Sequence, residues 1–150
     1  MAQQQEFAMA VVVDRVPPEA LHPFHAFLLA AAVPLFLGAL LSDIAYARSY
    51  QIQWANFASW LIAGALVFSG LAMLWAIVDL FRARRRGNRG LVYPVLLVAT
   101  WVLGFINALE HAKDAWAIMP TSLVLSVIVA VLACAATWFG LSTVRSGGAA

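Results

Sequence analysis

Charge is scarce in this 150-residue chain: only 11% of the residues are Asp, Glu, Lys or Arg, whereas 64% are hydrophobic. Soluble domains carry about 25% charged residues, so the chain has too little polar surface to form a water-facing shell. Cysteine is almost absent. The single Cys134 cannot form an internal disulfide, and its place within an apolar run is typical of a small hydrophobic residue. These two absences exclude a soluble or a disulfide-stabilised domain.

Motifs for catalysis or cofactor binding are also missing. The sequence has no c-type haem motif, no cysteine cluster, no Walker loop, no Gly-rich dinucleotide loop and no Ser-His-Asp spacing. The start, MAQQQEF, lacks the basic region of a cleavable signal peptide, so we expect the first hydrophobic segment to be retained. The sequence therefore does not predict an enzyme.

Four long apolar runs fill the chain from Phe24 to Leu141. Each holds about 20 residues or more, enough at 1.5 Å per residue to cross a hydrocarbon core about 30 Å thick. The runs do not alternate apolar and polar residues, as the strands of a membrane barrel do. The sequence predicts an all-α, polytopic membrane protein, a bundle of four transmembrane helices. The helices are expected at residues 24–46, 57–81, 91–109 and 121–141, in a domain (21–142) between a polar arm (1–20) and a C-terminal tail (143–150).

Basic residues are concentrated in the turn between the second and third runs, which holds five of the nine. Because Lys and Arg collect on the cytoplasmic side, we expect this turn and both termini in the cytoplasm, with the chain in a bacterial inner (plasma) membrane. The same side chains would attract anionic lipid headgroups; the alternative is that they act as an orientation signal alone. The pI near 9.1 comes from this turn and does not suggest nucleic acid. The residues are Arg82, Arg84, Arg85, Arg86 and Arg89.

Three polar residues, His22, His25 and Asp79, are predicted to share the cytoplasmic leaflet. Their two imidazoles are three residues apart and so lie on one helix face. A helix start favours neutral imidazole, the form that binds a metal or haem. The alternatives are an interfacial or capping role for the histidines, and a local pair between Asp79 and Arg82. The sharper hypothesis is a His25–Asp79 hydrogen bond that joins the first two helices.

A second polar group lies near the opposite end of the predicted bundle. Part of it is a solvated helix end, because Glu110 has Lys113 at i+3 and Asp114 at i+4. Asn107 lies deeper, where an amide would seek a partner on another helix. We predict that the group meets a periplasmic partner. Its members are Asp43, Asn107, Glu110, His111, Lys113, Asp114 and Trp116.

The predicted topology restricts haem binding. His25 and His111 fall on opposite sides of the bilayer, separated by roughly 25–30 Å at 1.5 Å per residue. They cannot ligate the same haem. A haem b with two histidine ligands would need His22 or His25 to pair with the same residue of a second subunit, that is, a homodimer.

Three ordered segments carry a family resemblance. They are HPFHAFLLAAAVPLFLGALLSD, WANFASWLIAGALVFSGLAMLWAIVDL and FINALEHAKDAWAIMPTSLVLS. Over about residues 20–142 the chain resembles the bacterial family of predicted membrane proteins named domain of unknown function 2231. The resemblance implies a four-helix inner-membrane bundle. It also implies a partner of the periplasmic dehydrogenase type, for which a membrane subunit would pass electrons to quinone.

Three functions follow as hypotheses. The leading one is an anchor or accessory subunit for a periplasmic or membrane partner. The second is a haem- or quinone-binding electron-transfer subunit that uses His22 and His25. The third is a small proton-coupled transporter in which Asp43 and Asp79 carry the protons.

Overall fold

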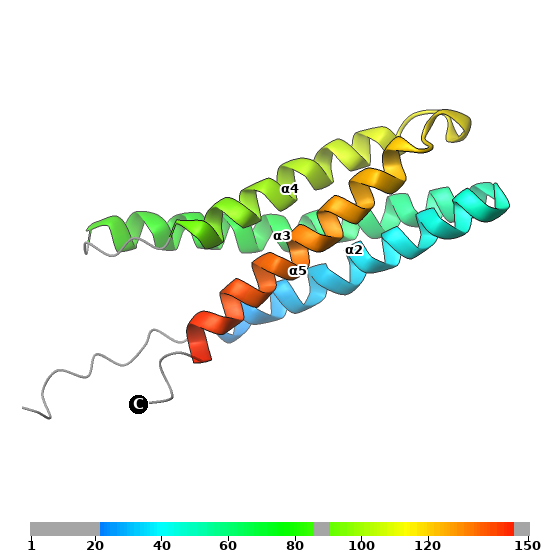
Figure 1. Cartoon of the computed structure of the whole chain (residues 1–150). Coiled ribbons are helices and arrows are strands. Elements are labelled where there is room, and N and C mark those ends of the chain that lie inside the picture. Colours follow the sequence, from blue (N-terminus) through cyan, green and yellow to red (C-terminus); the bar gives the residue numbers. More distant parts are fainter. Residues whose placement is uncertain (1–21, 86–90, 146–150) are drawn as a thin grey trace, which may run out of the picture.

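The computed structural model describes residues 22–85 and 91–145, which form four long α-helices and one short 3-10 turn (Figure 1). All four helices are long and apolar enough to cross a membrane. The predicted all-α membrane fold is confirmed. The elements are α2 (Pro23–Ser49), α3 (Ile52–Arg85), α4 (Val92–His111), η1 (Ala115–Ala117) and α5 (Thr121–Arg145).

The helices are longer than the apolar runs that predicted them. α3 begins at Ile52 rather than at residue 57 and ends at Arg85 rather than at residue 81. α5 continues to Arg145, inside the predicted tail (143–150). Hydropathy marks only the part of a helix that lies in hydrocarbon, whereas backbone hydrogen bonding continues through polar residues on either side. The predicted arm (1–20) lies outside the described residues.

A tight turn replaces the broad outer loop predicted between the first two helices. α2 ends at Tyr50, which adopts a left-handed conformation (φ 53°) and donates its backbone N–H to Tyr46 O at 2.7 Å. This is a common way to terminate a helix. Only Tyr50 and Gln51 separate α2 from α3.

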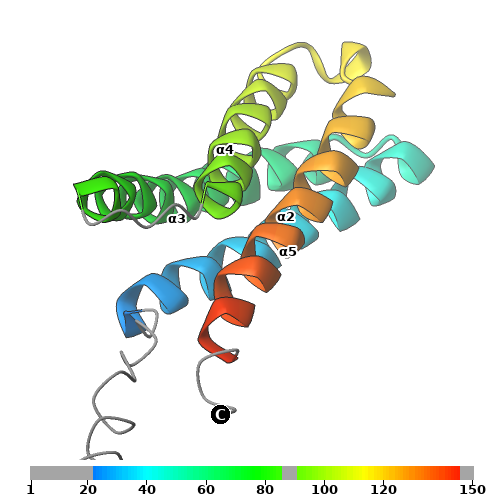
Figure 2. The same cartoon turned by 60° about the vertical axis from the view of Figure 1, so that its left-hand side comes forward.

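The helices are arranged in a ring in which α2 contacts α3 and α5, and α4 contacts α3 and α5. The α2–α3 turn and η1 lie at the same end of the bundle (Figure 1). We call this the turn end. Away from it, the pair α2 and α5 diverges from the pair α3 and α4 (Figure 2). The ring of Tyr93 on α4 lies close to Gly140 of α5, because a Cβ atom added to Gly140 would stand 2.8 Å from this ring.

Small side chains allow the helices to pack closely. Ala58, Ala65 and Ala72 of α3 are completely buried, and buried small residues are the usual means of close approach between membrane helices. Larger residues such as Phe36 and Leu97 fill the space between them. By contrast, many large apolar side chains face outward, as expected for a surface that contacts lipid tails. These include Leu41, Trp60, Val67, Leu74, Val95, Val131 and Trp138.

Candidate functional site

A buried polar cluster lies inside the bundle near its turn end. It is formed by Asp43 of α2, Asn107 and His111 of α4, and Ser126 of α5. Asp43 is 0% exposed, Asn107 is 1% exposed and Ser126 is 2% exposed. Charged and strongly polar groups are costly to place inside a membrane-spanning bundle unless they are paired. These four residues are therefore the primary candidates for a functional site.

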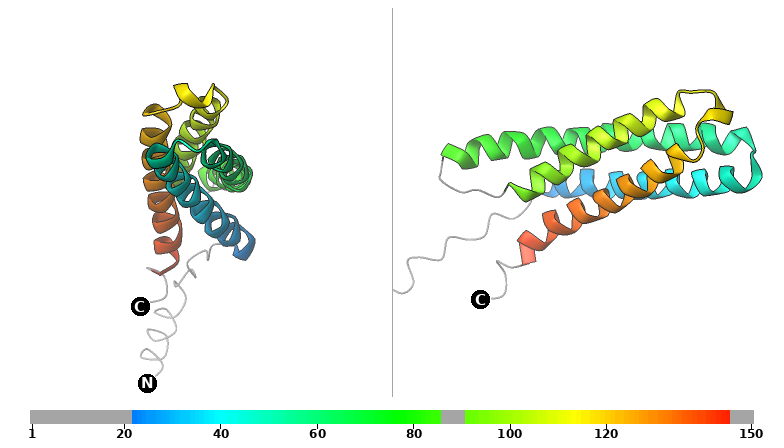
Figure 3. Two further views of the ribbon diagram at one scale, coloured as in Figure 1. Left: turned by 90° about the vertical axis from the view of Figure 1, so that its right-hand side faces the viewer. Right: turned by 45° about the horizontal axis from the view of Figure 1, so that its top comes forward.

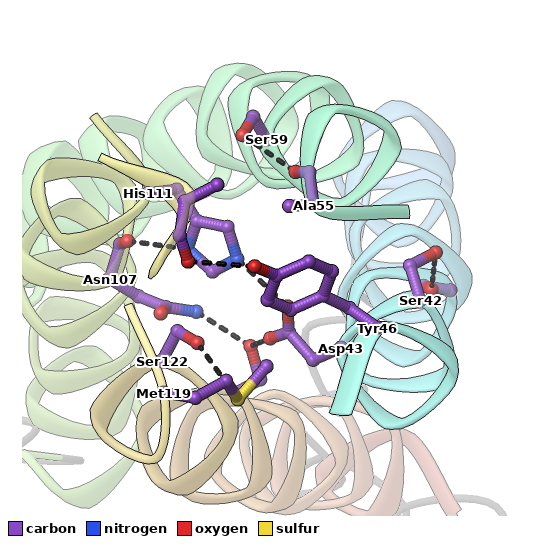
Figure 4. Close-up of polar contacts among 12 residues, drawn as sticks. Ser42, Asp43, Tyr46, Ala55, Ser59, Asn107, His111, Met119 and Ser122 are labelled. Carbon is purple, nitrogen blue, oxygen red and sulfur yellow. Dashed lines mark hydrogen bonds and ion pairs between the residues drawn. The ribbon is translucent and has the colours of Figure 1, made fainter. Parts of the chain in front are cut away.

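The four residues form a closed ring of hydrogen bonds, which we call the polar ring (Figure 4). Asp43 Oδ1 lies 2.9 Å from His111 Nε2, and Asp43 Oδ2 lies 2.5 Å from Ser126 Oγ. Asn107 Nδ2 donates to Ser126 Oγ at 2.8 Å. His111 Nδ1 lies 2.9 Å from the backbone oxygen of Asn107, which closes the ring. The ring thereby ties α2, α4 and α5 together.

The partners in the ring assign its protons. A backbone carbonyl can only accept, so His111 Nδ1 carries a hydrogen and donates it to Asn107 O. Ser126 donates to Asp43 Oδ2, and its oxygen accepts from the Asn107 amide. One proton is then left between Asp43 Oδ1 and His111 Nε2. Whether it resides on the carboxyl or on the imidazole, the pair as a whole has no net charge, which suits a water-poor interior.

One acceptor in the ring stays unused. Asn107 Oδ1 is buried and has no hydrogen-bond partner among the described residues. Its amide nitrogen must point toward Ser126, because the Ser126 hydroxyl hydrogen is already directed to Asp43. The orientation of the amide is therefore fixed by the ring, with one oxygen left unsatisfied.

The arrangement is not that of a catalytic triad. In a Ser-His-Asp triad the imidazole lies between the hydroxyl and the carboxylate, whereas here the carboxylate of Asp43 lies between Ser126 and His111. The hydroxyl therefore has no adjacent imidazole to accept its proton. Among the described residues there is also no group of three or more His, Cys, Asp or Glu side chains that could hold a metal ion. The geometry supports a role in joining helices.

The segment between α4 and α5 packs onto the same end of the bundle. Tyr46, 2% exposed, donates its hydroxyl to Ala115 O at 2.8 Å, so α2 holds η1 in place. Ile118, 1% exposed, packs with Tyr46 and Ala55 of α3. Trp116 is instead 79% exposed, and its ring stacks on Tyr50 with centroids 6.3 Å apart. A fixed turn thus presents an exposed indole.

Comparison with known families bears directly on this chain. A family described as predicted membrane protein (DUF2231) matches residues 21–150, nearly all of the sequence. The chain belongs to this family. No match was found among curated proteins or among solved structures. The DUF2231 assignment agrees with the resemblance in the three segments quoted above.

The structure divides the outer polar group predicted for this DUF2231 member into two parts. Asp43, Asn107 and His111 lie inside the bundle, so the prediction that they face a partner is wrong. They are buried because each polar group finds its partner on a neighbouring helix. The other four lie at or near the surface. Glu110 and Lys113 form a local ion pair at 2.6 Å, while Asp114 and Trp116 are exposed.

The inner polar group is not assembled as predicted. His25 is 2% exposed, and its Nε2 contacts the hydroxyl of Tyr93 on α4. Its Nδ1 is buried without a partner among the described residues, so the predicted His25–Asp79 hydrogen bond is absent. Asp79 lies 3.7 Å from Arg82, at an exposed site, which matches the local pair weighed as the alternative. The reason is that Asp79 lies on an exposed face of α3, whereas His25 points into the bundle.

His22 caps the start of α2 and is exposed. Its Nδ1 accepts the backbone N–H of Phe24 at 3.3 Å, and its ring lies 5.1 Å from that of Trp75 on α3. The capping role given as the alternative for His22 is therefore confirmed. His25 of α2 contacts Tyr93 near the start of α4, whereas His111 is the last residue of α4, so the two histidines lie toward opposite ends of the bundle.

Sequence reasoning did not select Ser126, Tyr46 or Tyr93. Serine is frequent in membrane helices, where its hydroxyl usually bonds to its own helix, as Ser42 does to Gly38 O. Tyrosine is common at membrane interfaces. Of these three residues, only Ser126 could have been anticipated from the sequence, because the amide of Asn107, deep in an apolar helix, requires a polar partner on another helix.

Proposed function

We propose that this protein is a non-catalytic accessory subunit or anchor, which binds a partner protein through the turn end of the bundle. The observation that carries the proposal is the exposed indole of Trp116, held on a turn that Tyr46 fixes to α2. Tryptophan is among the residues most enriched at the energetic centres of protein interfaces. A side chain that is already ordered loses little conformational entropy on binding.

The buried groups at the same end support a structural role. The hydroxyl, imidazole and carboxyl groups of the polar ring are 2% exposed or less, so a substrate in solution does not reach them. This end presents to a partner an exposed aromatic surface formed by Tyr50 and Trp116. This composition favours recognition over chemistry.

The orientation is part of the proposal. Arg82 lies in the last turn of α3, at the end opposite the turns, and the positive-inside rule assigns this arginine-rich part of the sequence to the cytoplasm. The turn end then faces the periplasm of a bacterial inner membrane. A periplasmic dehydrogenase, the partner type implied by the family resemblance, is the first partner class to test. A cysteine introduced at Gln51 should react with a membrane-impermeant maleimide in intact cells; protection there would reverse the orientation.

The test of partner binding compares two exposed tryptophans. Trp116 is 79% exposed at the turn end, and Trp138 is 70% exposed on α5 toward the opposite end. Affinity-tagged wild-type protein is crosslinked in native membranes and purified, and retained proteins are quantified by mass spectrometry. Loss of a hot-spot tryptophan costs about 2 kcal/mol or more, so we expect Trp116→Ala to reduce recovery of a specific partner about tenfold or more.

Trp138→Ala is the matched control, because it removes the same side chain from a lipid-facing position. It should leave partner recovery unchanged. Equal losses in both variants would show that the indoles act only as membrane-interface anchors, which contradicts the proposal. The same holds if wild-type protein retains no partner, or only further copies of itself.

A further inference from the structure

The polar ring has the capacity for one further proton. Asp43 Oδ1 and His111 Nε2, 2.9 Å apart, share a single proton, and His111 Nδ1 already carries its own. The most protonated forms of the two groups are a carboxylic acid and an imidazolium with a hydrogen on each nitrogen. The pair is one proton short of these forms. Because two groups in such close contact titrate together, the additional proton is bound by the pair rather than by either residue alone.

The geometry of the ring determines where the additional proton lies. In the fully protonated pair His111 Nε2 donates, so Asp43 Oδ1 has to accept. The hydrogen of the carboxylic acid then lies on Oδ2, which faces Ser126 Oγ at 2.5 Å. Oδ2 thereby changes from an acceptor into a donor. The hydroxyl hydrogen of Ser126 has to turn away from Asp43, and inside the bundle it requires another acceptor.

Asn107 supplies this acceptor. Its Oδ1 is buried and has no partner among the described residues, and its Nδ2 lies 2.8 Å from Ser126 Oγ (Figure 4). Rotation of the amide by half a turn exchanges its oxygen and its nitrogen, which have nearly the same shape, and brings Oδ1 to Ser126. One end of the amide is unpaired before the rotation and at most one end after it. The exchange therefore creates no additional unsatisfied group.

We propose that the polar ring is a proton-binding site, which takes up the additional proton by reversing the direction of its hydrogen bonds. In the reversed ring Asp43 Oδ2 donates to Ser126 Oγ, and Ser126 donates to Asn107 Oδ1. His111 donates through both of its nitrogens. The same side chains remain in contact, so α2, α4 and α5 stay joined. The proposal does not depend on partner binding at the turn end, because it needs only the four residues of the ring.

The turn end suits both the arrival of a proton and the charge that it brings. His111 is the last residue of α4, which ends at the turn end together with η1 and the α2–α3 turn (Figure 3). The next two residues of the chain are exposed, and protons move along hydrogen bonds without the opening that a substrate needs. The C-terminal end of a helix attracts a cation, and the carboxylate of Glu110 also attracts one at His111. Lys113, paired with Glu110 at 2.6 Å, offsets part of this attraction.

Other ionisable groups have less influence on the pair. α3 has no charged residue before Asp79 and α5 has none before Arg145, and both of these lie toward the opposite end of the bundle. Arg48 of α2 and Asp114 are exposed, so salt screens their charges. Tyr46 lies one turn from Asp43, but its hydroxyl already donates to a backbone oxygen. The charge of the pair is therefore set mainly by its own protons and by the Glu110–Lys113 pair.

Proton uptake can be followed directly in the wild-type protein. The full-length protein, with isotope-labelled histidine and asparagine, is titrated in lipid nanodiscs from mildly alkaline to acid pH. Nuclear magnetic resonance reports the His111 imidazole and the Asn107 amide, and infrared difference spectroscopy reports the C=O stretch of a protonated carboxyl group. In the acid state we expect an imidazolium at His111 and a carboxylic acid at Asp43. The Asn107 amide signal should shift with the same midpoint as the carboxyl band, which Asp43→Asn should lose.

Ser126→Ala tests whether Asn107 responds through the ring. The Ser126 hydroxyl is the only link between the carboxyl group of Asp43 and the amide of Asn107 among the hydrogen bonds of the ring. Without it, the shift of the Asn107 amide signal at the carboxyl midpoint should be lost. Ser42→Ala is the matched control, because Ser42 is a buried serine that bonds only to its own helix; this variant should keep the shift. The exposed amide of Asn56 is the internal reference and should show no such shift.

Three outcomes overturn the proposal. The first is that Asp43 remains a carboxylate at every pH at which the protein is folded, as judged by circular dichroism. The second is that Asp43 gains a proton while the Asn107 amide signal stays constant, since the ring then does not reverse. The third is that the Asn107 signal shifts equally in wild-type protein and in folded Ser126→Ala, which would indicate a general response of the bundle to acid. The first two outcomes are read from wild-type protein and do not require a folded variant.

Discussion

Substitution of Asp43 is the most direct test of the polar ring. In the wild-type protein its carboxyl group contacts His111 Nε2 at 2.9 Å and Ser126 Oγ at 2.5 Å, and the residue is 0% exposed. Asp43→Ala leaves the buried Ser126 hydroxyl without its acceptor and the buried His111 Nε2 without its partner. Each such orphaned group costs about 1–3 kcal/mol.

Measurements on membrane proteins indicate a smaller cost for each lost hydrogen bond. Hydrogen bonds between membrane helices average about 0.6 kcal/mol and reach about 1.7 kcal/mol, because the unfolded chain also finds partners in the membrane. Two lost bonds at the upper part of this range give about 2–3 kcal/mol. We therefore expect Asp43→Ala to lower the free energy of unfolding by about 2–3 kcal/mol.

Asp43→Asn should be much milder, because the ring can be completed without a charge. The Asn oxygen would accept the Ser126 hydroxyl, and its amide would donate to Nε2 of a neutral His111. The Nδ1 hydrogen of His111 would remain directed to Asn107 O. Since every group keeps a partner, we expect a loss below about 1 kcal/mol.

The assay is reversible unfolding in mixed micelles of mild detergent and sodium dodecyl sulfate, followed by circular dichroism. Glu110→Gln is the control, because it breaks an ion pair near the surface that is worth about 0–1 kcal/mol. Asp43→Ala/His111→Ala should cost less than the sum of the two single variants, since each removes the other's partner. An Asp43→Ala variant as stable as wild-type protein would refute the reasoning, as would an Asp43→Asn variant as unstable as Asp43→Ala.

Further predictions concern single groups at both ends of the bundle and in its core. Ser126→Ala should lower the free energy of unfolding by about 1–2 kcal/mol, because the Ser126 hydroxyl accepts from Asn107 and donates to Asp43. Ser42→Ala loses only a hydrogen bond to its own helix, so in the same unfolding assay it should cost less than about 0.5 kcal/mol. Gly70→Ala should destabilise the protein by about 1–3 kcal/mol, because the new Cβ would stand 2.9 Å from Trp101 Nε1, which donates to Leu66 O. Gly64→Ala on the same helix is the control: its new Cβ would meet only Leu35, at 3.5 Å, so this variant should be neutral or stabilising. Tyr93→Phe should lower the melting temperature because His25 loses the only hydrogen-bond partner of its ring among the described residues; equal melting curves would contradict this. Tyr46→Phe should free η1 and make a cysteine at position 115 more reactive toward maleimide, with Tyr50→Phe as the control.

The outline of the fold was predictable because the energy that sets it depends on local composition. Each apolar run must be transferred into lipid and must satisfy its own backbone hydrogen bonds, so a run of sufficient length becomes a helix wherever its neighbours lie. This logic located all four helices. It missed their polar ends, such as Ile52 at the start of α3 and Arg145 at the end of α5, because hydropathy carries no information outside the hydrocarbon.

The candidate site was predictable only in part. Asp43, Asn107 and His111 were selected because polar groups in apolar helices need partners. The sequence did not indicate that they would be buried together, since Asp43 and His111 are 68 residues apart and belong to helices that do not follow one another. The same limit explains why the sequence predicts a hydrogen bond from His25 to Asp79, whereas in the structure His25 contacts Tyr93.

The sequence by itself determined the class of the protein, the number and approximate positions of its helices, and the residues that are expensive to bury. Only the tertiary structure decided which of these residues meet. Whether a segment enters the membrane as a helix depends on the hydropathy of that segment alone. The rotation and axial position of each helix depend on contacts with side chains from three or four helices at once. Ala65 and Gly104 permit the close approach that brings α2, α4 and α5 to the polar ring, and Tyr46 fixes the turn that leaves Trp116 exposed.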